Sequence, residues 1–463
     1  MRLHAVVLAA GQGKRMKSKL FKVLHQVCGK PMVLHVVDML RELSVERTVV
    51  VVGHGAEAVK GAVADRAEYA MQEQQLGTGH AVLQAAPLLE QEEGLTLVLY
   101  GDTPLLTAET IRQMVEAHRK NGAAATLLTA QMPDPKGYGR IIRDESGEVT
   151  SIVEEKDCNP EQRGITEINT GTYCFDNRKL FAALHNVTNH NAQSEYYLTD
   201  VIGILQQAGE KVAGFVMSDP AESIGVNDRI ALSEVEAIMR RRINRKHMTE
   251  GVTLIDPDST YIEADVRIGS DTIIYPGTVL RGHTVIGEDC IIGPQTEMTD
   301  SVVGSGSEIK RSVLLEAETG VNAHVGPFAY LRPGTKLRAN VKIGDFVEIK
   351  NAVIGEGSKV PHLSYVGDAE VGKNVNIGCG SITANYDGVN KHKTEIGDNA
   401  FIGSNSNLIA PVRIGNDAYV VAGSTITHAV NDGDLAIARA RQANKPGYAE
   451  KLKKRIRGNK LSE

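Results

Sequence analysis

Residues 396–426, IGDNAFIGSNSNLIAPVRIGNDAYVVAGSTI, carry an aliphatic side chain at every sixth position, and Gly often follows it. Two earlier stretches keep the same spacing, and the positions in phase are Ile268, Ile274, Leu280, Ile286 and Ile292, then Val325, Leu331, Leu337, Ile343 and Ile349, then Ile396, Ile402, Leu408, Ile414, Val420 and Ile426. A six-residue period with Ile-Gly steps is the signature of a hexapeptide parallel β-helix. At about 18 residues per triangular coil, residues 266–426 predict about nine coils with the aliphatic side chains inside.

The period fails at two places in this array. It shortens by one residue between Ile349 and Ile354, and His362 follows shortly afterwards. It is lost after Thr383, so we expect residues 385–393 to leave the coils as a loop, against a neighbouring chain. The regular coils form a frame, and we expect the chemistry at the interruptions. A prism with three flat faces can pack around a three-fold axis, which predicts a homotrimer.

Length and composition narrow the class of protein. A chain of 463 residues is too long for one core, so we expect two or three domains. The net charge of −6, the absence of Trp and the 4% aromatic content argue against a nucleic-acid partner. The sequence starts directly in an apolar strand, without a signal peptide, and no apolar run is long enough for a membrane span. Five scattered cysteines without a CxxC pair favour reduced thiols in a cytoplasmic protein: Cys28, Cys158, Cys174, Cys290 and Cys379.

The first half of the chain alternates apolar runs with amphipathic stretches. Strand candidates are residues 5–8, 48–52 and 95–100, and a helix capped by Thr107 follows the last of them. This alternation predicts a parallel, doubly wound, Rossmann-like α/β sheet, whose ligands bind beyond the carboxyl ends of the strands. We expect four segments along the chain: the α/β domain at 1–227, a linker helix at 228–250, the β-helix domain at 251–437 and a C-terminal tail or helix at 438–463.

A glycine loop joins the first strand to a basic segment. The residues from Leu8 to Met16 read LAAGQGKRM, and Lys22 follows. Glycines let backbone N–H groups approach an anion, and two cations, Arg15 and Lys22, suit a triphosphate. The motif is neither a Walker A loop nor a dinucleotide fingerprint, because it lacks the Gly-Lys-Ser/Thr ending and has Met16 where the third Gly belongs. A plain glycine turn is the alternative interpretation.

Two further motifs end in polar or acidic groups. An apolar strand ends in Tyr100-Gly101-Asp102, and a carboxylate at that position is a common Mg²⁺ ligand for nucleotide phosphates. A simple cap of the next turn would explain Asp102 equally well. The stretch from Gln72 to Gly79 is polar and glycine-rich, which suits hydrogen bonds to a base, although an ordinary loop has the same composition.

Two basic runs permit a nucleic-acid or phosphate role. The first, Arg240 to Arg242 with Arg245 and Lys246, lies on the expected linker helix, and we interpret it as a solvated face. The second, from Lys451 to Arg457, is interpreted as an exposed helix, and a contact with a CoA phosphate is the alternative.

Over essentially its whole length the chain resembles the bifunctional bacterial N-acetylglucosamine-1-phosphate uridylyltransferase / glucosamine-1-phosphate N-acetyltransferase family. The motifs that carry the resemblance are Leu8 to Gly11 with Arg15-Met16, Lys22 to His25, Tyr100 to Pro104, Gly225 to Asp228, Lys350, His362 to Asp368, Asn385 to Gly388 and Ala438 to Arg441. The first three are shared with sugar-nucleotide pyrophosphorylases in general. Two positions depart from the family, which commonly has Thr at Lys14 and Pro at Phe21.

The resemblance implies a nucleotidyltransferase in the first half, which transfers uridylyl from UTP to N-acetylglucosamine-1-phosphate and releases pyrophosphate. It implies Mg²⁺ on Asp102 and Asn227, and phosphate contacts from Arg15 and Lys22. The remaining implied substrate-binding residues are Leu8, Ala9, Ala10, Gly11, Gln72, Gly77, Thr78, Tyr100 and Gly101 toward the nucleotide, and Gly139, Glu154 and Asn169 toward the sugar.

For the second half the resemblance implies a left-handed parallel β-helix of hexapeptide repeats, which transfers acetyl from acetyl-CoA to glucosamine-1-phosphate. An amine must be neutral to attack a thioester, so a base that titrates near neutral pH is useful, and His362 is the candidate. Arg332 and Lys350 are separated by the length of one predicted coil and should stack on one face, where two cations suit a sugar phosphate. The other implied residues are Tyr365 and Asn376 for the sugar, and Cys379, Asn385, Tyr386, Ser404, Ala422 and Arg439 for acetyl-CoA.

The most direct hypothesis is therefore a cytoplasmic, homotrimeric enzyme of UDP-N-acetylglucosamine synthesis, which supplies precursors for peptidoglycan and lipopolysaccharide. Its partners would be small molecules, UTP, acetyl-CoA and the two sugar phosphates, without nucleic acid or membrane. One alternative is a pyrophosphorylase whose β-helix serves only assembly or regulation. A non-catalytic scaffold is the other, and it predicts loss of Arg15, Lys22 or Asp102, all of which are present.

Overall fold

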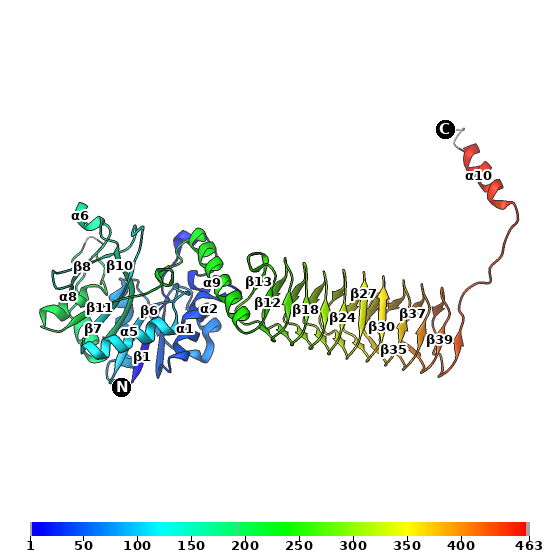
Figure 1. Cartoon of the computed structure of the whole chain (residues 1–463), viewed down its shortest axis with the longest axis horizontal. Helices are drawn as coiled ribbons and strands as arrows, with labels where there is room; N and C mark the ends of the chain where they lie inside the picture. Colours follow the sequence, from blue (N-terminus) through cyan, green and yellow to red (C-terminus); the bar gives the residue numbers. More distant parts are fainter. Residues whose placement is uncertain (1, 192, 460–463) are drawn as a thin grey trace. The chain divides into compact units, whose positions relative to one another are not determined.

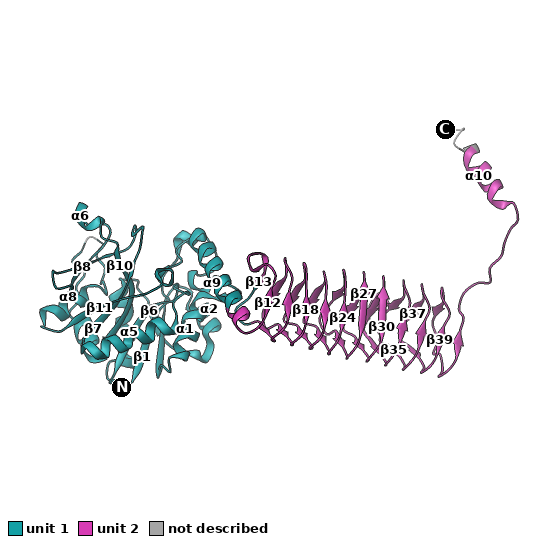
Figure 2. Ribbon diagram, viewed as in Figure 1, with its two compact units in different colours: residues 1–245, 262–265 teal, residues 246–261, 266–463 magenta. Residues whose placement is uncertain are grey.

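The computed structural model describes residues 2–191 and 193–459, and it divides into two compact units (Figure 2). Unit 1 comprises Met1–Arg245 with Ile262–Asp265, and unit 2 comprises Lys246–Tyr261 with Val266–Glu463. Unit 1 is an α/β domain, and unit 2 is a stack of short strands followed by a tail and one helix (Figure 1). Within the described residues, no helix is long and apolar enough to cross a membrane.

The central path of the unit 1 sheet has the order β11-β7-β10-β6-β1-β4-β5. The three strands expected from the sequence are confirmed. The path consists of β1 (Leu3–Leu8), β4 (Arg47–Val52), β5 (Glu68–Met71), β6 (Leu95–Tyr100), β7 (Ala125–Gln131), β10 (Glu167–Asp176) and β11 (Val212–Val216).

The prediction of a wholly parallel sheet is wrong at β10. This strand runs antiparallel to both of its neighbours, β6 and β7. The connection from β7 to β10 contains a hairpin, β8 (Arg140–Arg143) with β9 (Val149–Val153), and a four-residue helix, α6 (Pro160–Arg163). Parallel neighbours need a long crossover helix between them, and antiparallel neighbours do not, so a connection without such a helix returns the chain in the opposite direction.

Helices cover both faces of this sheet. The strand β1 alternates its apolar side chains between the two faces, so a hydrophobic core forms on each. Ala5 and Val7 face the first core, and Val6 faces the second. The first core is covered by α1 (Met32–Glu42), α2 (Ala56–Val63) and α5 (Ala108–Asn121). The second is covered by α3 (Thr78–Leu83), α4 (Ala86–Leu89), α7 (Asn177–Leu184) and α8 (Asp200–Gln207).

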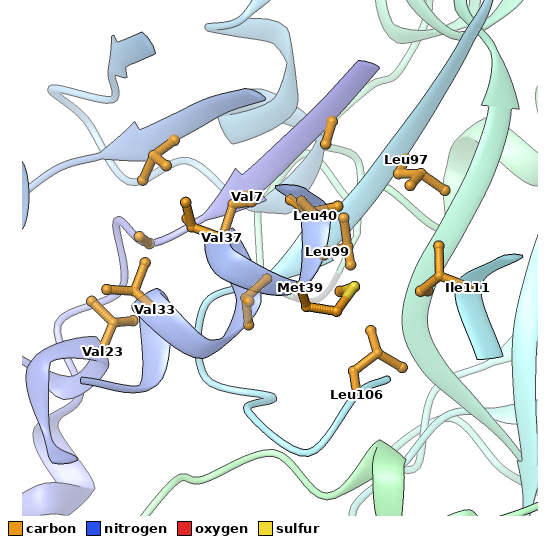
Figure 3. Packing of buried hydrophobic residues seen from close by; sticks show 14 of the residues in the cluster. Val7, Val23, Val33, Val37, Met39, Leu40, Leu97, Leu99, Leu106 and Ile111 are labelled. Carbon is orange, nitrogen blue, oxygen red and sulfur yellow. The ribbon is translucent and has the colours of Figure 1, made fainter. Parts of the chain in front are cut away.

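Figure 3 shows the first core from close by, with Val33 and Val37 of α1 among its side chains. Leu97 and Leu99 of β6 are fully buried there, and each such side chain contributes roughly 1.5–3 kcal/mol to folding. The predicted cap of α5 is confirmed, because the Thr107 hydroxyl accepts a hydrogen bond from the Thr110 N–H at 3.2 Å. These contacts hold the strand ends, and the loops that follow them, in fixed positions.

The helix predicted after residue 228 is α9 (Arg229–Thr249). Its Val235 is buried with Met16 and Leu105 in a third, smaller core of unit 1. The interpretation of its basic run as a purely solvated face is wrong for Arg242. That side chain donates to the Leu105 carbonyl oxygen at 2.5 Å and pairs with Asp219 at 2.9 Å, so it ties the helix to unit 1.

Among the described residues, the coils of unit 2 form three sheets of 11, 10 and 9 strands, with one strand of each sheet in each complete coil. The first sheet runs from β12 (Thr253–Leu254) to β41 (Leu435–Ala436), the second from β13 (Tyr261–Ile262) to β40 (Thr425–Ile426), and the third from β14 (Arg267–Ile268) to β38 (Val412–Ile414). The predicted β-helix is confirmed, and so is its length of about nine coils, because the shortest of the three sheets has nine strands. Further strands lie before residue 266 and after residue 426.

The register explains the six-residue period. Ile274 pairs in parallel with Ile292 of the next coil, and both side chains are fully buried. Several corners hold Asp or Asn at positive φ, such as Asp289 at 57° and Asn340 at 59°, because these residues tolerate the left-handed region. The Gly of an Ile-Gly step is required by close coils: a Cβ on Gly355 would lie 2.2 Å from the next coil's carbonyl oxygen.

Of the two interruptions predicted in the six-residue period, the loop at 385–393 is a distinct feature of the structure and the shortened step before His362 is not. Residues 385–393 do leave the coils, between β34 (Ile382–Ala384) and β35 (Thr394–Ile396), and close on themselves through a bridge from Tyr386 to Lys391. The shortened step before His362 is not distinctive, because the coil that pairs Met298 with Leu314 is also shorter than the regular repeat. The basic run near the C-terminus forms α10 (Tyr448–Asn459), and its described side chains, through Arg457, are exposed.

Candidate functional site

A pocket with a volume of about 530 Å³ lies at the carboxyl ends of β1 and β6 in unit 1. Nearly every residue predicted for nucleotide and sugar binding lines it: Leu8, Ala9, Ala10, Gly11, Lys22, Gln72, Gly77, Thr78, Tyr100, Asp102, Gly139, Glu154, Asn169 and Asn227. Gly101 and Arg15 are the predicted residues outside this lining. Gly101 donates its N–H to the Leu8 carbonyl oxygen at 2.9 Å, and Arg15 is exposed on η1 (Lys14–Met16).

The glycine loop brings a lysine into this pocket. Gly13 has a φ of 62°, and a Cβ at this position would lie 2.5 Å from the Cβ of Lys22. Only glycine therefore fits between the two turns. Lys22 is the first residue of η2 (Lys22–Leu24). Its side chain points toward Asp102, which follows β6, and toward Asn227, which precedes α9.

Asp102 and Asn227 converge on a single cationic group. The Nζ of Lys22 donates to Asn227 Oδ1 at 2.7 Å and forms an ion pair with Asp102. A carboxylate and an amide oxygen that can hold one cation are suitable ligands for Mg²⁺, which usually takes one or two protein oxygens and fills its other positions with water and substrate phosphates. Within the described residues, no group of three or more His, Cys, Asp or Glu side chains forms a metal site.

The end of the pocket that was predicted to bind a nucleotide is shaped by hydrogen bonds between its own loops. Gln72 Nε2 donates to the Gly77 carbonyl oxygen at 3.1 Å, and Gln75 Nε2 donates to the Ala10 carbonyl oxygen at 2.5 Å. Gly77 has a φ of 114° and lies against Tyr196, whose carbonyl oxygen would be 2.5 Å from a Cβ. Gln75 also lines the pocket, and sequence reasoning missed it although it stands between Gln72 and Gly77.

The opposite end of the pocket carries a perturbed carboxyl group. Burial raises the pKa of Glu154, and the nearby Asp157 and Asp200 raise it further. Burial also raises the pKa of Tyr100 well above its usual value, with smaller contributions from Asp102 and Glu154. The pocket lining also includes Tyr138, Thr170 and Glu195, none of which was predicted as a binding residue.

In unit 2, His362 lies at the corner between β30 (Lys359–His362) and β31 (Tyr365–Gly367). Its side chain is 57% exposed, and Nδ1 lies 2.7 Å from Asp345 Oδ1. The predicted stacking of Arg332 and Lys350 is confirmed, because the register that pairs Leu331 with Ile349 sets these two side by side on consecutive coils.

Both stacked cations already have acidic partners. Arg332 pairs with Glu348 at 2.8 Å, and Lys350 pairs with Asp368 at 3.2 Å. The Arg332 pair is exposed and open to an incoming ligand, whereas the Lys350 pair is mostly covered. A sugar phosphate would have to compete with Glu348 for the guanidinium.

The loop at 385–393 adds polar groups to the same region. Asn385 Nδ2 lies near the Tyr365 hydroxyl, at 3.4 Å, and donates to Asp368. Lys391 was not predicted from the sequence. Its place in the loop predicted to leave the coils, together with the predicted phosphate-binding cations Arg332 and Lys350, could have indicated it. Its pKa is lowered, first by Lys350, and it lines a hollow of about 410 Å³ together with Asp368.

The residues predicted for acetyl-CoA lie mostly along one corner of successive coils. The Asn405 N–H donates to the Cys379 carbonyl oxygen at 2.7 Å, and the Gly423 N–H donates to the Ser404 carbonyl oxygen at 2.8 Å. Ala422 directly precedes Gly423, and the Cδ of Arg439 lies 3.8 Å from the position of a Cβ on Gly423. Asn376 begins β33 (Asn376–Ile377) in register with Lys359, and Tyr386 is exposed on the loop.

Comparisons with known proteins agree with this division. The chain matches the family of MobA-like NTP transferase domains over residues 5–194. It matches the bacterial transferase hexapeptide family (six repeats) over residues 265–300 and 393–428.

Relatives of similar length match the whole chain. It is 60% identical over 451 residues to the "Bifunctional protein GlmU" of Brevibacillus brevis, covering 97% of this chain and 98% of the relative. It is 59% identical over 459 residues to the protein of the same name from Geobacillus thermodenitrificans, covering 99% of both chains. The protein of that name from Listeria monocytogenes serotype 4a is 57% identical over 449 residues, covering 97% of this chain and 98% of the relative.

Proposed function

Because this chain belongs to the family of bifunctional GlmU proteins, we propose that each of its two units holds one of two consecutive transfer reactions. The protein is an enzyme of UDP-N-acetylglucosamine synthesis. It transfers acetyl from acetyl-CoA to glucosamine-1-phosphate, and then uridylyl from UTP to N-acetylglucosamine-1-phosphate with release of pyrophosphate. The product is a precursor of cell-wall polymers.

Uridylyl transfer belongs to the pocket of unit 1. The sugar phosphate supplies its own nucleophile, so the protein has to position two phosphates and neutralise their charge. Asp102 and Asn227 would hold Mg²⁺, which supplies charge neutralisation at the phosphate oxygens. Lys22, freed from Asp102, would donate to the phosphate chain, and Arg15 would reach it from outside the pocket lining. The loop residues Gln72, Gly77 and Thr78 would hold the uracil.

The sugar would lie toward Gly139, Glu154 and Asn169. A Cβ on Gly139 would come within 3.6 Å of the Glu154 carboxylate oxygens, so the glycine keeps that carboxylate open to a hydroxyl group. Asn169 is held in place because its Nδ2 donates to the Tyr173 hydroxyl at 2.8 Å. Both side chains can then act as fixed hydrogen-bond partners for the sugar.

Acetyl transfer belongs to the corner of unit 2 that carries His362. This imidazole would accept a proton from the amine of glucosamine-1-phosphate as the amine attacks the thioester carbonyl carbon. The C–N bond forms, the C–S bond breaks, and the proton passes on to the departing CoA thiolate. Arg332 and Lys350 would bind the sugar phosphate with Tyr365 and Asn376, and the corner from Cys379 to Arg439 would hold acetyl-CoA with Asn385 and Tyr386.

A homotrimer would complete the second site. His362, Arg332 and Tyr386 lie on an exposed outer surface, and a thioester attack needs a site from which water is excluded. Packing the flat faces of three prisms together would bring another chain over this corner. We place the enzyme in the cytoplasm, where UTP and acetyl-CoA are both available.

The observation that carries the proposal is the meeting of Lys22, Asp102 and Asn227 at one point of the pocket, in a chain whose other unit presents His362 beside two stacked cations. Purified protein should form UDP-N-acetylglucosamine only when acetyl-CoA, glucosamine-1-phosphate, UTP and Mg²⁺ are all present. Omission of acetyl-CoA should be rescued by N-acetylglucosamine-1-phosphate. Product formed from N-acetylglucosamine-1-phosphate alone, with no acetyl transfer under any condition, would leave the β-helix with only an assembly role.

A further inference from the structure

The strands β27 (Lys342–Asp345) and β30 place the Asp345 carboxylate against His362. The proposed acetyl transfer gives this carboxylate no role. Asp345 and His362 end their strands and are direct partners in the parallel register. Their side chains meet at 2.7 Å, between Oδ1 and Nδ1. An ionised carboxylate can only accept, so Nδ1 carries the proton of this hydrogen bond and Nε2 is the ring nitrogen left to accept another.

We propose that Asp345 is a positioning residue for acetyl transfer, which holds His362 in the tautomer with a basic Nε2 and stabilises the imidazolium formed during the reaction. This inference rests on the proposed role of His362. When the amine of glucosamine-1-phosphate attacks, its proton moves to Nε2 and the ring becomes positive beside the Asp345 carboxylate. The charge is lost again when the ring protonates the CoA thiolate.

The carboxylate that pairs with His362 is Asp345, at 2.7 Å. Glu348, on β28 (Glu348–Lys350), is instead paired with Arg332 at 2.8 Å. The pKa of Asp345 is lowered, first by its hydrogen bond to His362, so this carboxyl stays ionised at the pH of the reaction. The other titratable groups around the pair are Lys342 and Lys359 on the same two strands, His324 on the preceding strand, Tyr365 after the corner and Cys379 in the next coil.

The same sheet contains a natural control for this pair. Glu308 and His324 also lie on consecutive coils, with an oxygen to Nδ1 distance of 3.3 Å. Both pairs place a carboxylate beside the Nδ1 of a histidine on the next coil, although Glu308 also pairs with Lys310. His324 lies outside the residues proposed to bind substrate. A general effect of removing a carboxylate from a histidine on this sheet would therefore appear in both positions.

The test compares Asp345→Asn, Asp345→Glu and Glu308→Gln in the full-length protein. Asp345→Asn should lower the kcat of acetyl transfer about 10- to 100-fold, change the KM for glucosamine-1-phosphate less than about two-fold, and move the acid limb of the pH profile to lower pH. Asp345→Glu should recover part of the rate. Glu308→Gln, and uridylyl transfer in all three variants, should match the unmodified protein.

A chemical modification experiment, which does not depend on catalysis, distinguishes the proposed role of Asp345 from that of His362. Diethylpyrocarbonate acylates neutral imidazole, so the rate at which it modifies His362, followed by mass spectrometry across pH, should also shift to lower pH in Asp345→Asn. If His362→Ala abolishes acetyl transfer while Asp345→Asn changes neither kcat nor these profiles, the role of Asp345 is wrong and that of His362 stands. If His362→Ala leaves acetyl transfer intact, the proposed function of His362 fails first.

Discussion

The two units place their candidate sites in opposite ways. In unit 1 the site is a hollow of about 530 Å³, enclosed by loops from one chain, because a parallel strand array ends in loops that can surround a ligand. In unit 2 the coils are filled with aliphatic side chains such as Leu280 and Leu331, which are fully buried. A solid prism leaves no interior for a ligand, so its chemistry has to lie on the outer surface.

This difference changes what each site requires. The pocket of unit 1 gathers Lys22, Asp102 and Asn227 from distant parts of one chain. Under the proposed function this pocket acts within one chain, whereas the exposed surface around His362 needs a second surface to exclude water. The two proposed activities should therefore respond differently to mutation, to dilution and to pH.

Replacement of His362 by alanine should give the largest separation between the two units. General-base catalysis contributes about 10²–10⁴-fold, so acetyl transfer should fall by that factor. Uridylyl transfer should change by less than two-fold, roughly, because no part of the other unit is altered. Separate assays of CoA release and pyrophosphate release measure the two rates. An equal loss of both activities in a folded variant would contradict the assignment of one reaction to each unit.

Asp102→Ala should have the converse effect, with the same minimum size. Loss of several kcal/mol of charge stabilisation corresponds to a fall of at least about 100-fold in uridylyl transfer. The Mg²⁺ concentration for half-maximal rate should rise as well, since only Asn227 remains as a protein ligand. Acetyl transfer serves as the internal control in the same preparation. A variant with normal turnover of UTP would remove Asp102 from the proposed metal site.

Dilution tests whether the surface site needs a second chain. If the acetyl-transfer site is completed by a neighbouring chain, its specific activity should fall about 10-fold or more once the protein is diluted well below the assembly constant. Uridylyl transfer per chain should stay constant over the same range. Mass photometry on the same samples would report the oligomer present. Full acetyl transfer by a monomer would contradict the proposed trimer.

The KM of unit 1 for its sugar substrate should show a pH dependence of a few-fold, which comes from Glu154 and is separate from the pH profile of acetyl transfer. The pKa of Glu154 is raised by burial and then by Asp157 and Asp200, so this carboxyl takes up a proton at a higher pH than an ordinary glutamate. As the pH falls through this raised pKa, the KM for N-acetylglucosamine-1-phosphate should rise because the carboxylate is lost. Asp157→Asn should move this rise to lower pH, because it removes one cause of the shift. An unchanged profile in that variant would remove Glu154 from sugar binding.

Features that depend on neighbouring residues could be predicted from the sequence, whereas features that depend on contacts between distant segments could not. The β-helix was predictable because a six-residue period repeats a local rule, and each coil contacts mainly its neighbours. The antiparallel direction of β10 was not, since it depends on how the chain returns after the β8–β9 hairpin. The shortened step before His362 was also misleading, because a shortened coil, from Met298 to Leu314, occurs where no site is proposed.

Site residues divide in the same way. Gly13, Asp102 and His362 stand in motifs, so their type and spacing already indicated chemistry. Partnerships across coils or loops did not appear in any local pattern: Asp345 against His362, Lys391 beside Lys350, and Glu348 on Arg332. Each of these pairs depends on which residues of successive coils lie side by side. A coil of a different length would place another residue next to the same side chain.

Glycine substitutions give the smallest effects and compare the packing of the units directly. A Cβ on Gly403 would lie 2.4 Å from the Ala422 backbone nitrogen, so Gly403→Ala must push apart two coils at the proposed acetyl-CoA corner. We expect it to destabilise unit 2 by about 1–3 kcal/mol and to raise the KM for acetyl-CoA several-fold.

Gly61, in α2, is the matched control, because no heavy atom lies within 4 Å of its Cβ position. Gly61→Ala should stabilise the helix by about 0.5–1 kcal/mol, since alanine loses less backbone entropy on folding. Thermal unfolding with and without UTP and Mg²⁺ distinguishes the transition of unit 1 from that of unit 2. If Gly403→Ala left its transition unchanged, the coils would have room to separate, and close packing would not explain the Gly in each Ile-Gly step.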